Sequence, residues 1–470
     1  MALTASRPAT IGQLRDSGWK SVPVKEEVRR NAAARIAAGQ PLVRGVLGFD
    51  ETVLPQLENA VLAGHDVIFL GERGQAKTRI IRSLVELLDE DTPIVAGSEI
   101  NDDPYHPVSR AARDLVAERG DDTPIEWVGR HQRFGEKLAT PDTSIADLIG
   151  EVDPIRVAEG RYLSDELTLH YGLVPRTNRG IFAINELPDL AERIQVGLLN
   201  VLEERDVQVR GYKVRLPLDV LLVASANPED YTNRGRIITP LKDRFGAQIR
   251  THYPLDVATE LEVVRQEWQP PVLDGVRVDV PDHMAEIVGL ISHEARRHAN
   301  VNQRSGVSVR LSVANYETLV ANAVRRALRL GEPDAVPRVS DLESLVSSTA
   351  GKVEIETLDD GEGEAIIGRI VKTAVLSVFR SRCRIDDYRT VLAGFDEGGF
   401  VNVGDDVPSA EYLPVLTRFP ALRKPVASLA DGETPAAVAS ALELVLEGLH
   451  LSRRLNKDAV GGRATYRSRG

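Results

Sequence analysis

The stretch GERGQAKT, at positions 71 to 78, has the residue types and the order of a phosphate-binding loop. Such a loop needs consecutive backbone N–H groups that point at one spot, a lysine that reaches the terminal phosphates, and a hydroxyl group for magnesium. Position 76 is alanine where glycine is usual, and we expect alanine to be accepted there with a negative φ. The predicted phosphate-contacting residues are Gly71, Glu72, Arg73, Gly74, Gln75, Ala76, Lys77 and Thr78.

A second polar pair, Asn185 and Glu186, follows the apolar run 180-GIFAIN-185. Nucleoside triphosphatases with this type of sheet commonly carry Asp-Glu here: the first carboxylate holds the magnesium shell, and the second orients or polarises the attacking water. Asn185 can accept a hydrogen bond from a metal-bound water but lacks the charge. We therefore expect weaker magnesium binding, which does not by itself mean that hydrolysis is lost. The alternative is that both residues merely cap the next helix.

Three further residues could take part in phosphate chemistry. Asn227 ends an apolar run, where its side chain could hold the attacking water or sense the terminal phosphate. Arg244, in 241-LKDRFG-246, and Arg310, in 308-SVRLS-312, are candidates to stabilise developing negative charge. An arginine supplied by a neighbouring subunit can raise the rate on the order of 10³ to 10⁵-fold. The alternative for each arginine is a surface ion pair.

The elements that must position these residues alternate between buried strands and amphipathic helices. This pattern predicts an α/β fold with a parallel sheet covered on both faces. Helical spacing follows the phosphate loop and recurs at 189–204, and the next segment alternates like a hairpin around Gly211. The predicted strands are 66-DVIFL-70, 180-GIFAIN-185 and 220-VLLVASAN-227.

The chain has 470 residues, which is enough for about three folded units. After residue 254 the pattern changes to successive helices, and the C-terminal end, 453–470, is basic and expected to be a solvated disordered tail. The expected parts are an N-terminal segment at 1–40, an α/β nucleotide-binding core at 41–254, a helical lid at 255–350 and a mostly helical C-terminal extension of unknown role at 351–470.

Composition excludes several classes of function. A net charge of −12 argues against nucleic-acid binding through the whole surface. The single cysteine, Cys383, cannot form an internal disulfide, and no apolar run is long enough to span a membrane. We therefore expect a cytoplasmic protein. The sequence 293-HEARRH-298 places its histidines five residues apart, whereas the zinc motif HExxH places them four apart, so we do not predict zinc there.

Together and in this order, the motifs resemble those of the AAA+ ATPases, over roughly residues 40 to 345. GERGQAKT is similar to the loop of MoxR-type ATPases, in which Ala-Lys-Thr is common. The stretch 176-RTNRGIFAINE-186, the hairpin and 225-SANPEDY-231 look more like the ATPase subunit of magnesium chelatase. The resemblance therefore indicates the clade that contains both, with an AAA+ core, a helical lid and a mostly helical extension.

The resemblance also implies roles for individual residues and an assembly. Because a site completed by an arginine from a neighbour requires oligomers, it implies a ring of identical subunits, commonly a hexamer. Asn185 departs from the aspartate of the family. The implied roles are ATP and Mg²⁺ binding for Lys77 and Thr78, with Asn185 also at the metal, water activation for Glu186, first sensor for Asn227, a finger inserted into the neighbouring subunit for Arg244, and second sensor in the lid for Arg310.

Three hypotheses for the function remain open from the sequence. The first is a MoxR-type ATPase that remodels or loads metal into a partner protein, often with a separate protein that carries a von Willebrand factor A domain. The second is the ATPase subunit of a magnesium or cobalt chelatase that acts on a tetrapyrrole. The third is a nucleotide-gated structural ring with weak hydrolysis, suggested by Asn185. A transcription activator of the same superfamily is disfavoured by the absence of a GAFTGA loop.

Overall fold

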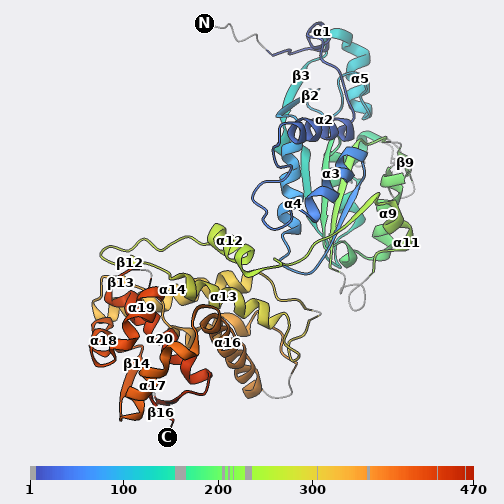
Figure 1. Ribbon diagram of the computed structural model, residues 1–470. Coiled ribbons are helices and arrows are strands. Elements are labelled where there is room, and N and C mark those ends of the chain that lie inside the picture. Colours follow the sequence, from blue (N-terminus) through green and yellow to red (C-terminus); the bar gives the residue numbers. More distant parts are fainter. Residues whose placement is uncertain are drawn as a thin grey trace, which may run out of the picture. The chain divides into compact units, whose positions relative to one another are not determined.

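The computed structural model forms two compact units, Met1–His252 and Tyr253–Gly470 (Figure 1). Helices and a central sheet make up the first unit, and helices dominate the second. The structure describes residues 7–153, 166–203, 207–209, 212–214, 216–227, 236–303, 305–356, 360–430, 432–460 and 462–469.

A parallel sheet forms the centre of the first unit. Within the described residues its strand order is β11-β1-β10-β7-β4, and all of its pairings are parallel. After β1 the chain continues to β4 at the far edge of the sheet and comes back through β7 and β10, and β11 then pairs with the other side of β1. The strand order therefore reverses at β1, beside the phosphate loop. Ligands of open parallel sheets bind at such a reversal. The strands are β1 (Val67–Leu70), β4 (Phe134–Leu138), β7 (Gly180–Asn185), β10 (Val220–Ala226) and β11 (Ala247–Arg250).

Both faces of the sheet are covered, as the near-continuous apolar runs predicted. Val67 and Phe69 of β1 belong to one core with the N-terminal helices, while Ile68 and Leu70 belong to the other. This alternation follows from the two-residue period of a strand. The first face carries α2 (Val24–Ala37), α3 (Val53–Ala63) and α4 (Lys77–Ser83), and the second carries α9 (Glu192–Glu203) and α11 (Thr239–Arg244).

Smaller elements surround this core. The N-terminal helix α1 packs Ile11 and Leu14 against Ile125, so the first forty residues are part of this unit. The predicted hairpin is present as β8 and β9, but Gly211 and residues 228–231 lie outside the described residues. These elements are α1 (Ile11–Asp16), β2 (Asp91–Val95), α5 (Arg110–Arg119), β3 (Ile125–Gly129), α6 (Ile145–Leu148), β5 (Gly150–Val152), β6 (Leu169–Tyr171), α8 (Leu173–Arg176), β8 (Val207–Val209) and β9 (Tyr212–Val214).

The second unit is built around the apolar helix α20, which is buried along most of its length. Helices on both sides of residue 350 share one core with it. The division into a lid at 255–350 and an extension at 351–470 stays a prediction. The helices are α12 (Val257–Glu267), α13 (Asp282–Ala295), α14 (Arg310–Leu330), α15 (Leu345–Ala350), α16 (Asp360–Arg382), α17 (Arg389–Asp396), α18 (Leu413–Arg418), α19 (Arg423–Leu429) and α20 (Pro435–Leu451).

The expectation of a disordered basic tail is wrong. β15 (Leu455–Val460) and β16 (Arg463–Ser468) form an antiparallel pair, and β14 (Phe400–Gly404) joins β16 on its other side. Tyr466 of β16 is buried and donates its hydroxyl to Glu447 of α20. Arg463 and Arg467 are exposed on this hairpin, while Leu455 and Ala464 pack inward, so charge alone gave the wrong prediction.

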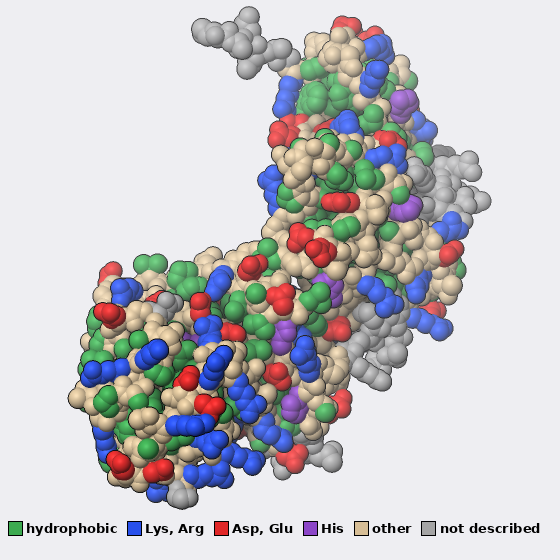
Figure 2. All heavy atoms as spheres, in the orientation of Figure 1, with side chains coloured by type: hydrophobic (Ala, Val, Ile, Leu, Met, Phe, Trp, Pro, Cys, Tyr) green, Lys and Arg blue, Asp and Glu red, His purple; other side chains and the backbone are tan. Residues whose placement is uncertain are grey.

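Surface charge is mixed on the face of the molecule shown in Figure 2, where acidic and basic side chains are interspersed on each unit. In the part of the chain that the structure describes, no helix is both long and apolar enough to cross a bilayer.

Candidate nucleotide site

The loop from Gly71 to Ala76 connects the end of β1 to the start of α4, as the motif predicted. A Cβ atom on Gly71 would lie 1.9 Å from Thr251 Oγ1 and 2.2 Å from Gln75 Oε1, so only glycine fits at this position. Gly74 has a φ of 76°, in the left-handed region where glycine is favoured. Gly74 is therefore favoured by its backbone conformation, and Gly71 by the two side chains that fill the space beside it.

Lys77 lies at the centre of the loop. Its side chain is buried, and its ammonium group donates to the carbonyl groups of Gly71 and Glu72, the latter at 2.7 Å. Gln75 Oε1 accepts hydrogen bonds from the Glu72 N–H, at 3.0 Å, and from the Thr251 hydroxyl, at 2.8 Å. The loop thus wraps around one positive charge and is fixed to the end of β11, an arrangement suited to a phosphate group.

Ala76 differs from the expectation of a negative φ. Its φ is 55° and its ψ is 11°, which places it in the left-handed region directly before the first residue of α4. Left-handed residues turn successive backbone N–H groups toward one side and so build concave anion sites. The structure keeps the left-handed turn of the motif even though its residue carries a Cβ, and the cost is backbone strain.

Hydrogen bonds join the phosphate loop to the end of β10, and join β10 in turn to the end of β7. The Gly71 N–H donates to the carbonyl of Ala226, the last residue of β10, at 3.1 Å. Ser225 accepts from the Glu186 N–H at 3.3 Å and donates to Asn185 Oδ1 at 3.2 Å. Three strand ends that are far apart in sequence therefore meet at one edge of the sheet, with the phosphate loop beside them.

Asn227 and Glu186 both lie at this edge, where the sequence placed them. Asn227 is buried directly after β10. Glu186 is partly buried and has a φ of 55°, so a second non-glycine residue of this edge is left-handed. Such strained positions tend to cluster at functional sites because the surrounding structure must hold them in place.

One residue at this edge was missed by the sequence analysis. Glu136 of β4 accepts a hydrogen bond from Asn185 Nδ2 on its Oε1 atom, at 2.5 Å, and from Arg82 Nε on its Oε2 atom, at 2.8 Å. The bond to Glu136 raises the pKa of the Arg82 guanidinium. The contact depends on the pairing of β4 with β7, so no local pattern in the sequence could have indicated it.

The two predicted arginines lie in different units. Arg244 is exposed at the end of α11, next to the buried Phe245, in the unit that holds the phosphate loop. Arg310 is exposed at the first residue of α14 in the second unit. Both roles stay predictions.

Comparison with known proteins indicates what the chain is similar to. A family model described as the Sigma-54 interaction domain matches residues 159–244. The magnesium-chelatase 38 kDa subunit of Cereibacter sphaeroides is 31% identical over 210 residues, which are 42% of this chain and 54% of that protein. The magnesium-chelatase subunit ChlI of a Nostoc species is 28% identical over 233 residues, 47% of this chain and 57% of that protein. These similarities support an AAA+ ATPase of the clade that contains the MoxR-type and magnesium-chelatase ATPases.

This AAA+ chain spans about half the length of the curated relatives it matches. Among solved structures, a model of the complex between subunits BchI and BchD of magnesium chelatase is 22% identical with a TM-score of 0.35, over 66% of this chain and 97% of that chain. NtrX from Brucella abortus in complex with ATP is 12% identical with a TM-score of 0.36, over 73% of this chain and 72% of that chain.

The AAA+ family implies Mg²⁺, and the residues at the sheet edge fit it. Mg²⁺ prefers oxygen ligands and is usually held by one or two protein groups together with substrate phosphates. The Thr78 hydroxyl, the Asn185 amide oxygen and the Glu136 carboxylate are donors of this kind. No group of three or more His, Cys, Asp or Glu residues within the described ranges could hold a metal by itself. The donor set therefore matches a metal that is shared with a nucleotide.

Histidine 293 of the HEARRH segment has a different environment. Its ring lies 3.2 Å from the buried carboxylate of Glu260, which also accepts two bonds from Arg296 and one from Ser312. Burial by itself would raise the pKa of Glu260, but these hydrogen bonds and the positive charge of Arg296 outweigh it and lower the pKa. The cluster connects helices of the second unit of the AAA+ chain.

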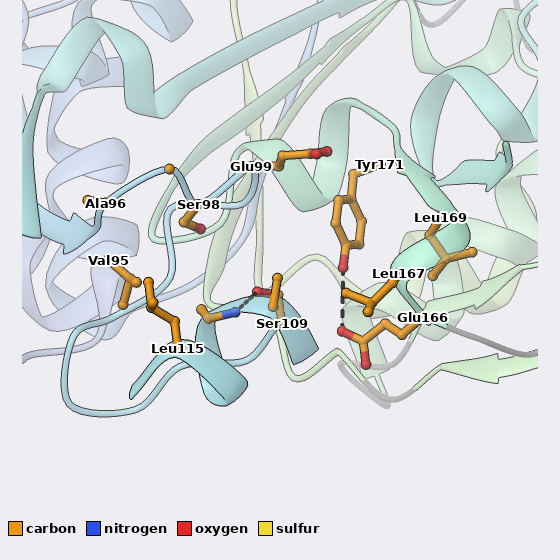
Figure 3. A pocket seen from close by; sticks show the side chains of 13 residues that line it. Val95, Ala96, Ser98, Glu99, Ser109, Leu115, Glu166, Leu167, Leu169 and Tyr171 are labelled. Atoms are coloured by element: carbon orange, nitrogen blue, oxygen red, sulfur yellow. Dashed lines mark hydrogen bonds between the residues drawn. The ribbon is translucent and has the colours of Figure 1, made fainter. Parts of the chain in front are cut away.

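Two cavities of the AAA+ chain lie away from the predicted nucleotide residues. The smaller cavity, of about 150 Å³, lies in the first unit between the end of β2, the start of α5 and β6. In it the Tyr171 hydroxyl points to the Glu166 carboxylate, 3.4 Å away (Figure 3). The larger, of about 780 Å³, lies in the second unit beside the buried carboxylates of Glu443 and Glu447. None of the residues predicted for nucleotide chemistry lines either cavity.

Proposed function

We propose that this AAA+ chain binds and hydrolyses ATP with Mg²⁺, and that it couples the cycle in an oligomeric ring to remodelling or metal loading of a partner protein, as a MoxR-type ATPase. The observation that carries the proposal is the set of hydrogen bonds through Ala226 and Ser225. These bonds hold the phosphate loop beside Glu186 and next to Asn227.

Each residue at the sheet edge has a chemical task in this proposal. The Lys77 ammonium, which now donates to loop carbonyls, binds the terminal phosphates. The Glu186 carboxylate orients the attacking water and takes its proton, and the Asn227 amide holds that water in line. Thr78 and Asn185 would hold Mg²⁺, which would neutralise part of the negative charge of the phosphates.

Assembly into a ring follows from Arg244 in this proposal. The side chain is exposed, while the adjacent Phe245 anchors the backbone in the core. A guanidinium held in this way on the surface can enter the site of a neighbouring subunit, where it stabilises the charge that develops on the transferring phosphate. We therefore propose that the chain forms a ring, and we expect a hexamer. Measurement of the oligomer size with and without nucleotide tests this proposal.

A second function is favoured by the relatives. Proteins named as magnesium-chelatase subunits are similar to about half of this chain, which supports the alternative of an ATPase subunit of a magnesium or cobalt chelatase acting on a tetrapyrrole. The neighbouring genes separate the two proposals. Genes of tetrapyrrole synthesis would support chelation, and a gene for a von Willebrand factor A domain protein would support remodelling with that protein as the partner.

The client is tested with a variant that binds ATP but is slow to hydrolyse it. Glu186→Gln removes the charge of the water-activating group and should hold the ATP-bound assembly together with its client. We expect a defined partner in pull-downs with Glu186→Gln and ATP, and its loss when Lys77→Ala is added. Recovery of only the chain itself under both conditions would refute the remodelling proposal.

A further inference from the structure

Asn185 carries no charge, but the side chain that it contacts, Glu136, is a carboxylate. In the proposed site the last residue of this strand would ordinarily be a carboxylate, and asparagine has only a neutral amide there. The Glu136 carboxylate lies 2.5 Å from the Asn185 amide nitrogen. The direction of the amide is fixed, because the Ser225 hydroxyl donates to its oxygen and its nitrogen donates to Glu136. The neighbouring strand β4 thus brings one carboxylate to the position of the missing one.

The same carboxylate lies on the side of α4 that carries the magnesium-binding hydroxyl. Arg82, which binds the other oxygen of Glu136, follows Thr78 by four residues on α4. Residues four apart on a helix share one face, with Cβ atoms about 6 Å apart. Glu136 is therefore held between the helix face of Thr78 and the end of β7, the two elements that would hold the metal.

The bond between Arg82 and Glu136 does not tie up the carboxylate. The Arg82 side chain is 64% exposed, whereas that of Glu136 is 20% exposed. An ion pair whose cation is largely surrounded by water contributes little to stability. The contact with the buried Asn185 is the better fixed of the two, since Asn185 is also held by Ser225.

We propose that Glu136 supplies the negative charge of the magnesium shell in place of an aspartate at position 185, with Asn185 as the residue that positions it. This inference rests on the proposed function of the sheet edge. It explains why position 185 is an amide: an aspartate there would place two carboxylates in hydrogen-bonding contact, and each would oppose ionisation of the other. The two positions form a pair in which either one can carry the charge.

The test is the affinity of Mn²⁺ for the complex of the full-length protein with ADP, measured from the loss of the free Mn²⁺ signal in electron paramagnetic resonance. Glu136→Gln keeps the shape of the side chain and removes the charge, so we expect about a ten-fold weaker Mn²⁺ affinity, with metal-free ADP binding unchanged. Glu136→Gln combined with Asn185→Asp exchanges donor and acceptor and should restore the affinity to within about three-fold.

Two controls separate charge from structure. Arg82→Gln breaks the other contact of Glu136 but leaves its charge, and we expect the Mn²⁺ affinity to be kept. Glu86→Gln removes a carboxylate from a surface pair with Arg35 and should have no effect. Unchanged affinity in Glu136→Gln, or equal losses in Glu136→Gln and Arg82→Gln, would overturn the inference while leaving the proposed function intact. Failure of the unsubstituted protein to bind ADP would overturn both.

Discussion

Replacement of Ala76 by glycine should stabilise the first unit, because the structure holds this alanine in the left-handed region. A residue with a Cβ loses about 1 to 2 kcal/mol in that conformation, and glycine does not. The greater freedom of glycine in the unfolded chain returns about 0.4 to 1 kcal/mol. The expected net gain in the free energy of unfolding is therefore about 0.5 to 1 kcal/mol, a rise of about 1 to 4 °C in the unfolding midpoint for a unit of this size.

Thermal unfolding without nucleotide measures this gain, and a matched substitution gives the opposite sign. Ala34 is exposed on the helix α2 with ordinary helical geometry, so Ala34→Gly should cost about 1 kcal/mol. The prediction is a higher midpoint for Ala76→Gly and a lower one for Ala34→Gly. A midpoint that falls by the same amount in both variants would show that Ala76 has an ordinary φ, and would refute the strained loop.

Three further predictions concern buried groups of the two units and the shape of the phosphate loop. Glu27→Ala would leave the buried Arg133 guanidinium without the carboxylate it binds at 2.6 and 2.8 Å, so we expect a loss of about 3 to 5 kcal/mol in urea unfolding; the exposed Glu26→Ala should lose less than about 0.5 kcal/mol, and similar losses would contradict the prediction. Gly71→Ala would place a methyl group 1.9 Å from a hydroxyl oxygen, and we expect it to abolish ADP binding in calorimetry; retained affinity would contradict the loop geometry. Burial lowers the pKa of His283 from 6.5 to about 4. Because the unfolded chain takes up this proton first, stability should fall by up to about 3 kcal/mol from pH 6.5 to 4, and a His283→Gln variant with an equally steep loss would rule out this origin.

Much of the geometry of the candidate nucleotide site could be predicted because it is encoded locally. Lys77 and Thr78 lie within eight residues of a strand end, and the apolar runs before Asn185 and Asn227 mark strands buried on both faces. The carboxyl ends of parallel strands meet at one edge, so these residues were expected together. Their meeting through Ser225 and Ala226 follows from the same rule.

The parts that could not be predicted depend on contacts between distant segments. Glu136 reaches Asn185 only through the register of β4 against β7. Ala76 keeps a left-handed conformation because the strand and helix around it dictate the turn, against its own preference. The hydrogen bond from the Tyr466 hydroxyl to the buried Glu447 anchors the final hairpin. A count of basic residues in the sequence cannot indicate this contact.

The most direct measurement of the central claim is steady-state release of phosphate from ATP and Mg²⁺ by the purified chain. We predict turnover in the unsubstituted protein, a loss of at least about 100-fold in Glu186→Gln, as for removal of a general base, and a loss of ATP binding in Lys77→Ala. Phosphate release by Glu186→Gln at the unsubstituted rate would contradict the role of Glu186. No release from the unsubstituted protein, although it binds ATP, would contradict the account and leave a ring that only binds nucleotide.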